Sequence, residues 1–175
     1  MLSKVVVIGP ESTGKSTLSA ALARHFGCPW VPEFAREYLE RLARPYAYED
    51  LLDIGKGQIR LEDELAKEAD DLLLCDTDLH VVQVWSQHRF GKVHPWILEQ
   101  IRVRKYDLYL LTDIDIPWTD DPLREHPSPE MRQYFFDQYL RLVNATGVPF
   151  SIVSGTGIER FEFCVGRILG SRSKN

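Results

Sequence analysis

The chain has 175 residues, 44% of them hydrophobic and 27% charged, which is typical of one globular domain with a sizeable core. Its formal net charge of −5 argues against nucleic-acid binding, which needs a basic face. No apolar run approaches a membrane span and no signal-peptide pattern opens the chain, so we expect a cytoplasmic protein without membrane contact.

Short apolar runs alternate with helical patterns along the chain. Strands are expected at 4–8, 28–31, 72–76, 107–111 and 150–153. Helices are expected up to about residue 26 and at 33–44, 48–69, 79–90, 95–105 and 128–146, with a last apolar stripe at Ile158, Phe161, Val165 and Ile168. This alternation predicts a three-layer α/β fold, in which helices cover both faces of a five-stranded parallel sheet. Functional residues of such a fold lie beyond the carboxyl ends of the strands.

The first strand leads into Gly9-Pro10-Glu11-Ser12-Thr13-Gly14-Lys15-Ser16, which fits the phosphate-binding pattern G-x-x-x-x-G-K-[ST]. Glycines let successive backbone N–H groups point at a phosphate chain, and the following helix adds its positive N-terminus. We expect Lys15 to bridge the β- and γ-phosphates and the Ser16 hydroxyl to ligate Mg²⁺. The expected nucleotide-binding residues are Gly9, Glu11, Ser12, Thr13, Gly14, Lys15, Ser16 and Thr17, together with Arg124, Arg132 and Ser154. No N-K-x-D guanine-reading element occurs, so ATP is the expected donor.

Carboxylates follow the second and third strands. Asp76 ends the third strand like a Walker B residue and is expected to hold a water on Mg²⁺. The alternative is a helix N-cap, a position that Thr77 or Asp78 can also fill. Glu33 is expected to orient an acceptor hydroxyl and take its proton, although a first-turn acid is also favoured by the helix dipole. Asp78 competes for that catalytic role, and Arg36 lies one turn after Glu33.

Residues 113–132, which include Asp120-Asp121-Pro122-Leu123-Arg124, cannot build a core and are expected to form a lid. Arg124 and Arg132 are expected to reach the transferring phosphoryl group, with a solvated surface loop as the alternative. Among the aromatic residues, Tyr38, Trp85 and Trp118 are the preferred candidates for stacking on a substrate ring. Cys28, Cys75 and Cys164 are widely spaced and are expected to be reduced core residues.

The sequence resembles the nicotinamide ribonucleoside kinase domain of the bacterial NadR family. The resemblance is carried by 9–17, Glu33-Phe34-Ala35-Arg36-Glu37-Tyr38, Leu74-Cys75-Asp76-Thr77-Asp78, 106–118, 120–124 and Val153-Ser154-Gly155. It implies the nucleoside-kinase-like P-loop fold and ATP-dependent phosphorylation of the 5′-hydroxyl of nicotinamide riboside. NadR-type proteins usually also carry an adenylyltransferase domain. No H-x-G-H motif occurs here, so NAD synthesis and repression of transcription are not expected of this chain.

Alternative functions remain open from sequence alone. Arg36, Arg41 and Arg60 leave room for a phosphorylated acceptor, as in a nucleotide kinase, and another nucleoside is a further possibility. A regulatory protein that binds ATP without transferring phosphate is the alternative from another class. We expect residues 1–170 to form one P-loop domain and 171–175 a flexible tail. The expected partner is a small nucleoside, and the sequence does not define an oligomeric state.

Overall fold

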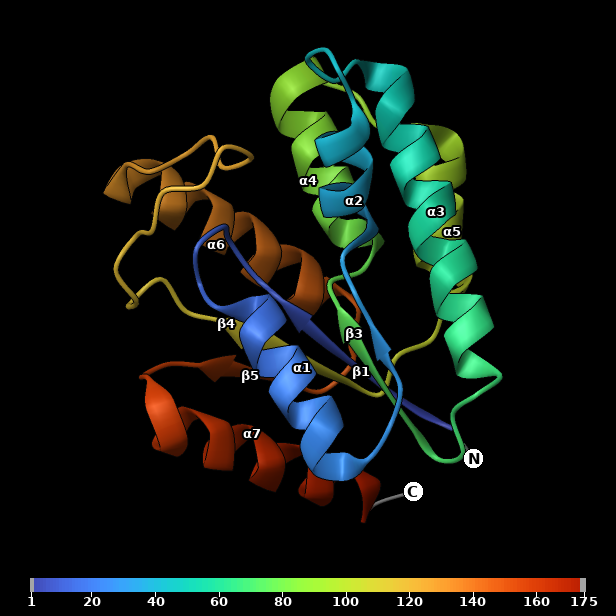
Figure 1. Cartoon of the computed structure of the whole chain (residues 1–175), viewed down its shortest axis with the longest axis vertical. Coiled ribbons are helices and arrows are strands. Elements are labelled where there is room, and N and C mark those ends of the chain that lie inside the picture. Colours follow the sequence, from blue (N-terminus) through green and yellow to red (C-terminus); the bar gives the residue numbers. More distant parts are fainter. Residues whose placement is uncertain (1, 174–175) are drawn as a thin grey trace.

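Five parallel strands form one sheet, and helices cover both of its faces in the computed structural model, which describes residues 2–173 (Figure 1). The strands are β1 (Ser3–Ile8), β2 (Trp30–Val31), β3 (Leu72–Asp76), β4 (Leu108–Thr112) and β5 (Phe150–Val153). Their order is β2-β3-β1-β4-β5, so β1 is central and pairs with both β3 and β4. The predicted fold class is confirmed.

The helices are α1 (Lys15–Phe26), α2 (Phe34–Arg41), α3 (Tyr48–Ala66), α4 (Leu79–Phe90), α5 (Pro95–Val103), α6 (Pro129–Ala145) and α7 (Gly157–Arg172). Alternate residues of β1 face opposite layers of the core. Val5 and Val7 pack with α1 and α7, whereas Val6 and Ile8 pack with α4 and α6. Helices α2 to α5 stand together beyond the β2 side of the sheet (Figure 1) and share a third apolar cluster.

Most differences from the predicted elements lie at helix ends. Helix α2 ends at Arg41 rather than Arg44, whose side chain instead pairs with buried Asp50 at 2.6 Å. Helix α5 ends before Arg104, which adopts an extended backbone and pairs with Glu62 at 3.0 Å. Arg44 and Arg104 thus each lie just beyond the end of their helix and form an ion pair with a carboxylate of α3.

The C-terminal helix also extends further than predicted. Helix α7 continues through Gly170 to Arg172, so residues 170–172 are helical rather than part of a tail, and 174–175 lie outside the described residues. Ile158 was expected in the apolar stripe of this helix, but it does not pack in the core, because the residue is 64% exposed. The three cysteines are free thiols, and Cys75 and Cys164 are buried. Among residues 2–173, no helix has the length and apolarity that a membrane crossing requires.

Candidate active site

The phosphate-binding loop joins β1 to α1 at the carboxyl edge of the sheet. Ser12 and Gly14 have positive φ angles of 56° and 72°, so the backbone curls between the strand and the helix. Gly14 is the N-cap of α1 and offers no side chain to cap it. The first N–H groups of α1 therefore remain available to an anion, which the helix dipole also favours.

Gly9 is required where the loop meets the end of β4. A Cβ atom at Gly9 would lie 2.3 Å from Oγ1 of Thr112, and the glycine φ is 149°. Thr112 also contacts Oγ1 of Thr13 at 2.7 Å, and Thr13 donates to the Pro10 carbonyl at 2.8 Å. Strand β4 thus fixes the base of the loop through one buried hydroxyl.

Arg160 supports the loop from α7 and was not predicted from the sequence. Its Nη2 donates to the Thr13 carbonyl at 2.7 Å, and the residue is only 5% exposed. Burial lowers the pKa of Arg160, and the charges of Asp115 and Asp113 oppose that effect. A buried cation therefore lies directly behind the backbone that is expected to cradle phosphate.

Lys15 is held inside the loop. Its Nζ donates to the Pro10 carbonyl at 2.6 Å. Burial lowers the pKa of Lys15, while the carboxylates of Glu33 and Asp76 raise it. The ammonium group is thus partly desolvated and hydrogen-bonded to the Pro10 carbonyl. A phosphate oxygen, as a charged acceptor, would bind it more strongly than this carbonyl does.

Asp76 is a buried carboxylate without a hydrogen-bond partner. It is 1% exposed, and among residues 2–173 neither oxygen has a partner of hydrogen-bonding geometry. Burial raises its pKa, and the Ser16 hydroxyl and Lys15 oppose the rise. An orphaned carboxylate beside a serine hydroxyl fits a hard cation that keeps several waters, as Mg²⁺ does. Within residues 2–173 no cluster of three His, Cys, Asp or Glu could ligate a metal by itself.

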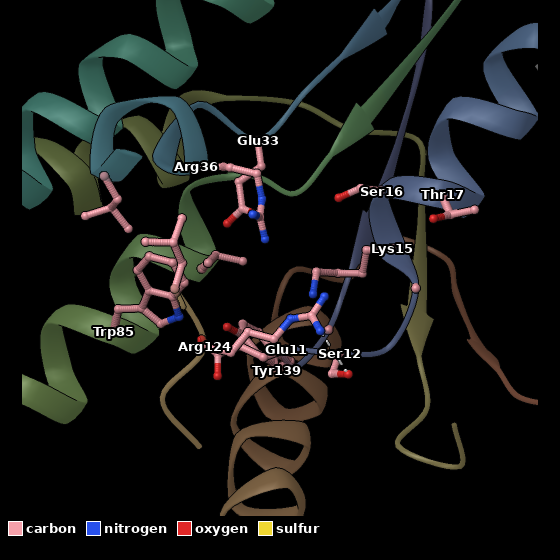
Figure 2. A pocket seen from close by; sticks show the side chains of 15 residues that line it. Glu11, Ser12, Lys15, Ser16, Thr17, Glu33, Arg36, Trp85, Arg124 and Tyr139 are labelled. Carbon is pink, nitrogen blue, oxygen red and sulfur yellow. Dashed lines mark hydrogen bonds between the residues drawn. The ribbon is translucent and has the colours of Figure 1, made fainter. Parts of the chain in front are cut away.

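A cavity of about 120 Å³ opens beside the loop. Figure 2 shows Glu33 and Arg36 facing Lys15 and Arg124 across it, with Trp85 on one side. It is lined by Gly9, Glu11, Ser12, Gly14, Lys15, Ser16, Thr17, Glu33, Arg36, Leu39, Val81, Trp85, Leu123, Arg124 and Tyr139. The structure therefore brings together most of the predicted nucleotide-binding residues and three of the predicted substrate-binding ones.

Two carboxylates, Glu33 and Asp78, are expected to act on the acceptor. Of these two, Glu33 lines this cavity and Asp78 does not. Glu33 is the N-cap residue of α2, yet its side chain makes no capping hydrogen bond. Burial raises the pKa of Glu33 from 4.5 to about 6, and the charge of Lys15 only partly offsets the rise. Such a carboxylate is ionised at neutral pH and basic enough to accept a proton.

The segment after β4 packs over the phosphate loop. Glu11 accepts from the backbone N–H groups of Glu125 and His126 at 3.1 and 3.3 Å. The Ser12 hydroxyl accepts from the Thr119 N–H at 2.8 Å, and Arg124 donates to the Thr119 carbonyl. The loop side chains thus hold this segment at several points.

This segment is also tied to the helices around the cavity. Arg36 of α2 pairs with Asp121 at 3.0 Å, and Arg89 of α4 pairs with Glu125 at 3.1 Å. Arg132, the first-turn arginine of α6, donates to the Ile116 carbonyl at 2.9 Å. Arg124 lines the cavity, whereas Arg132 does not and instead donates to the Ile116 carbonyl and, at 3.4 Å, to the Ser12 carbonyl of the phosphate loop.

Asp78 lies away from the cavity, contrary to its expected catalytic role. Its side chain caps α4 by accepting from the His80 N–H at 3.0 Å, and it also contacts the His80 ring and the Tyr109 hydroxyl at 2.7 and 2.8 Å. All of these partners are buried. The Asp78 carboxylate is therefore bound to buried groups of the protein, and Asp78 is the N-cap of α4, as the alternative interpretation expected.

Tyr38, Trp118 and Ser154 also lie outside the cavity lining. The Tyr38 hydroxyl donates to Asp50 at 2.8 Å, Trp118 Nε1 donates to Asp120 at 2.9 Å, and the Ser154 hydroxyl donates to Asp113 at 2.8 Å. The Trp118 ring instead lies 6.0 Å from the guanidinium groups of Arg124 and Arg132.

An aromatic recess adjoins the cavity and shares Glu11, Leu39, Trp85 and Leu123 with it. Its further lining residues are Tyr46, His88, Glu125, His126 and Phe135. The sequence did not predict this recess, whose lining comes from loops and from several helices that are distant in the chain, nor the cavity residue Tyr139 of α6. The recess has a volume of about 20 Å³, and Glu125 in its lining pairs with Arg89, whose guanidinium group lies 4.3 Å from the centre of the Tyr46 ring.

Comparison with known proteins agrees with this architecture. The AAA domain family matches residues 4–160. The trifunctional NAD biosynthesis/regulator protein NadR of Salmonella typhimurium is 29% identical over 168 residues, which cover 92% of this chain. The chain spans only 40% of that relative, so it corresponds to a part of it.

Solved structures show the same fold. A crystal structure of NadR protein in complex with NR matches 95% of this chain and 50% of the NadR chain, with a TM-score of 0.83 and 24% identity. Thymidylate kinase from Candida albicans matches 98% of this chain and 92% of its own, with a TM-score of 0.67 and 13% identity. The resemblance to NadR is confirmed, and the fold is that of P-loop nucleoside and nucleotide kinases.

Proposed function

The chain belongs to the AAA domain family, and we propose that it is an ATP-dependent kinase that phosphorylates the 5′-hydroxyl of nicotinamide riboside to give nicotinamide mononucleotide. One observation carries the proposal: the phosphate loop and the acceptor-side acid line a single cavity. A protein that only binds ATP needs the first of these features but not the second.

Phosphoryl transfer asks mainly for positioning and for neutralisation of charge. Lys15 and the N–H groups at the start of α1 would hold the donor phosphates. Arg124, which lines the cavity, would neutralise the phosphoryl group in transit. Glu33 would orient the acceptor hydroxyl and accept its proton, because its carboxylate faces Lys15 across the same space (Figure 2).

Ser16 and Asp76 would hold Mg²⁺, Asp76 through a water molecule. The support is the buried Asp76 carboxylate without a hydrogen-bond partner, close to the Ser16 hydroxyl. A magnesium ion bound there would neutralise charge on the donor phosphates.

The acceptor assignment rests on the recess and on the relatives. Nicotinamide riboside carries a positively charged pyridinium ring, and Tyr46, Trp85, Glu11 and Glu125 line the recess beside the cavity. The Trp85 ring, which lines both the cavity and the recess, would offer an aromatic face to such a cation. NadR, the relative quoted above, is a protein of NAD biosynthesis, which agrees with this choice.

We further propose that residues 1–170 act as one P-loop domain and that 113–132 form its lid. The contacts of Glu11 and Ser12 with this segment support the second proposal. Opening would break the Arg36–Asp121 and Arg89–Glu125 ion pairs, which tie the segment to α2 and α4.

A nucleoside panel tests the function. Purified protein is given ATP and Mg²⁺ with nicotinamide riboside, adenosine, cytidine, uridine, thymidine or a nucleoside monophosphate, and ADP release is measured. We expect nicotinamide riboside to have the highest kcat/KM. Turnover of another acceptor alone would refute the substrate, and slow ATP hydrolysis that no acceptor stimulates would refute the kinase.

A further inference from the structure

Gln58, in the middle of α3, holds the chain on both sides of Glu33. Its Oε1 accepts from the backbone N–H of Phe34 at 2.8 Å, and its Nε2 donates to the carbonyl of Pro32 at 3.2 Å. Gln58 is only 3% exposed. One buried side chain from another helix therefore fixes the two peptide groups that flank the acceptor-side carboxylate.

The Glu33 side chain makes no capping hydrogen bond to α2. The side chain of an N-cap residue commonly accepts from an N–H group in the first turn of its own helix. Glu33 occupies the N-cap of α2 without doing so, and Gln58 satisfies the N–H of Phe34, which precedes the N–H groups that a cap side chain reaches. The Glu33 carboxylate can therefore line the cavity instead of turning back on α2.

Gly57 provides a second anchor next to the first. A Cβ atom at Gly57 would lie 2.0 Å from Cε1 and 2.3 Å from Cδ1 of Phe34, so the Phe34 ring rests directly on the backbone of α3. Any other residue at position 57 must displace the residue that follows Glu33. The far end of α2 is held to the same helix, since the Tyr38 hydroxyl donates to Asp50.

We propose that Gln58 and Gly57 are positioning residues for phosphoryl transfer: they set the start of α2 so that the Glu33 carboxylate faces the acceptor hydroxyl. Neither residue lines the cavity. The inference rests on the proposed function, in which Glu33 receives the proton of the acceptor.

Gln58→Met tests the amide contacts, because it keeps the volume of the side chain and removes both hydrogen bonds. With the acceptor identified in the panel, we expect kcat to fall on the order of tenfold and the KM for ATP to change by less than about twofold. In a Glu33→Gln background, the same substitution should lower kcat by less than about twofold further, because the group it positions is gone. Gln138→Met on α6 is the matched control and should leave kcat unchanged.

Gly57→Ala tests the second anchor independently. If Gln58→Met does not fold, Gly57→Ala allows the same comparison of kcat between the wild-type and Glu33→Gln backgrounds. It should lower kcat in the wild-type background only. Gly166→Ala in α7 is its control, since an added Cβ there meets nothing within 4 Å. Equal losses of kcat in both backgrounds, or a loss confined to the KM for ATP, would overturn the positioning role. Wild-type kcat in Glu33→Gln would instead overturn the role proposed for Glu33 itself.

Discussion

Replacing Glu33 by Gln is expected to make the protein more stable and less active at neutral pH. Burial is the main cause of the rise in the pKa of Glu33 from 4.5 to about 6, and Lys15 opposes it. Because the folded state binds this proton more tightly than the unfolded chain, ionised Glu33 costs stability above about pH 6. That cost disappears below the unfolded pKa of 4.5.

The magnitude follows from the same two values. A rise from 4.5 to about 6, at about 1.36 kcal/mol per pKa unit, corresponds to about 2 kcal/mol. The side chain borders a cavity that solvent reaches, so we discount this to about 1 kcal/mol. Glu33→Gln should thus raise the free energy of unfolding by about 1 kcal/mol near pH 7.5 and by much less near pH 4.5. Its kcat should fall on the order of 100-fold.

Urea unfolding near both pH values and steady-state kinetics near the higher one measure these changes. Glu37→Gln is the control, because Glu37 lies on the same helix in an exposed pair with Arg41 and should shift the free energy of unfolding by less than about 0.5 kcal/mol. Equal stabilisation of Glu33→Gln near both pH values would refute the reasoning, and so would lower stability than the wild type near pH 7.5.

Three further substitutions test the donor side. Lys15→Ala should abolish phosphoryl transfer with an unchanged circular dichroism spectrum, because the fixed cation is lost while the core is untouched; near-normal turnover would contradict the site. Asp76→Asn should raise the Mg²⁺ concentration for half-maximal activity several-fold and should not destabilise the fold, since the carboxylate makes no hydrogen bond; an unchanged Mg²⁺ titration would count against the metal role. Arg160→Met should lower the free energy of unfolding by about 2 kcal/mol and raise the KM for ATP, because it removes a charged donor from the Thr13 carbonyl; wild-type values for both would show that the loop does not need this support.

The sequence predicted the donor half of the cavity because its parts are local. The strand, the loop and the helix that present Lys15 and Ser16 are consecutive, and their spacing alone defines their geometry. Glu33 was identified for a similar reason, since it directly follows a strand of a parallel sheet.

The acids after β3 show where the same rule fails. Asp76 is the last residue of β3 and Asp78 lies two residues beyond it, and the sequence alone did not decide between their roles. Thr77 between them has a left-handed φ of 72°, after which Asp78 caps α4 while Asp76 remains at the edge of the sheet near Ser16. A backbone angle of one residue thus decides which carboxylate is available.

Other residues depend on contacts that no local pattern encodes. Arg160 meets Thr13 across nearly the whole chain, and Gln58 meets Phe34 from a different helix. The sequence does not show that Gly57 is the surface on which the Phe34 ring packs. Such positions become visible only when the helices are placed against each other.

The wide separation of the loop's supports has a consequence for synthesis on the ribosome. Residues 9–16 are synthesised before β4 and α7, but β1 pairs with β4, Thr13 contacts Thr112, and Arg160 of α7 contacts Thr13. The phosphate-binding motif is therefore made before the elements that give it its final shape. A nascent chain that stops before α7 would display the phosphate-binding motif without its buried cation, so nucleotide binding should report the completion of folding rather than its beginning.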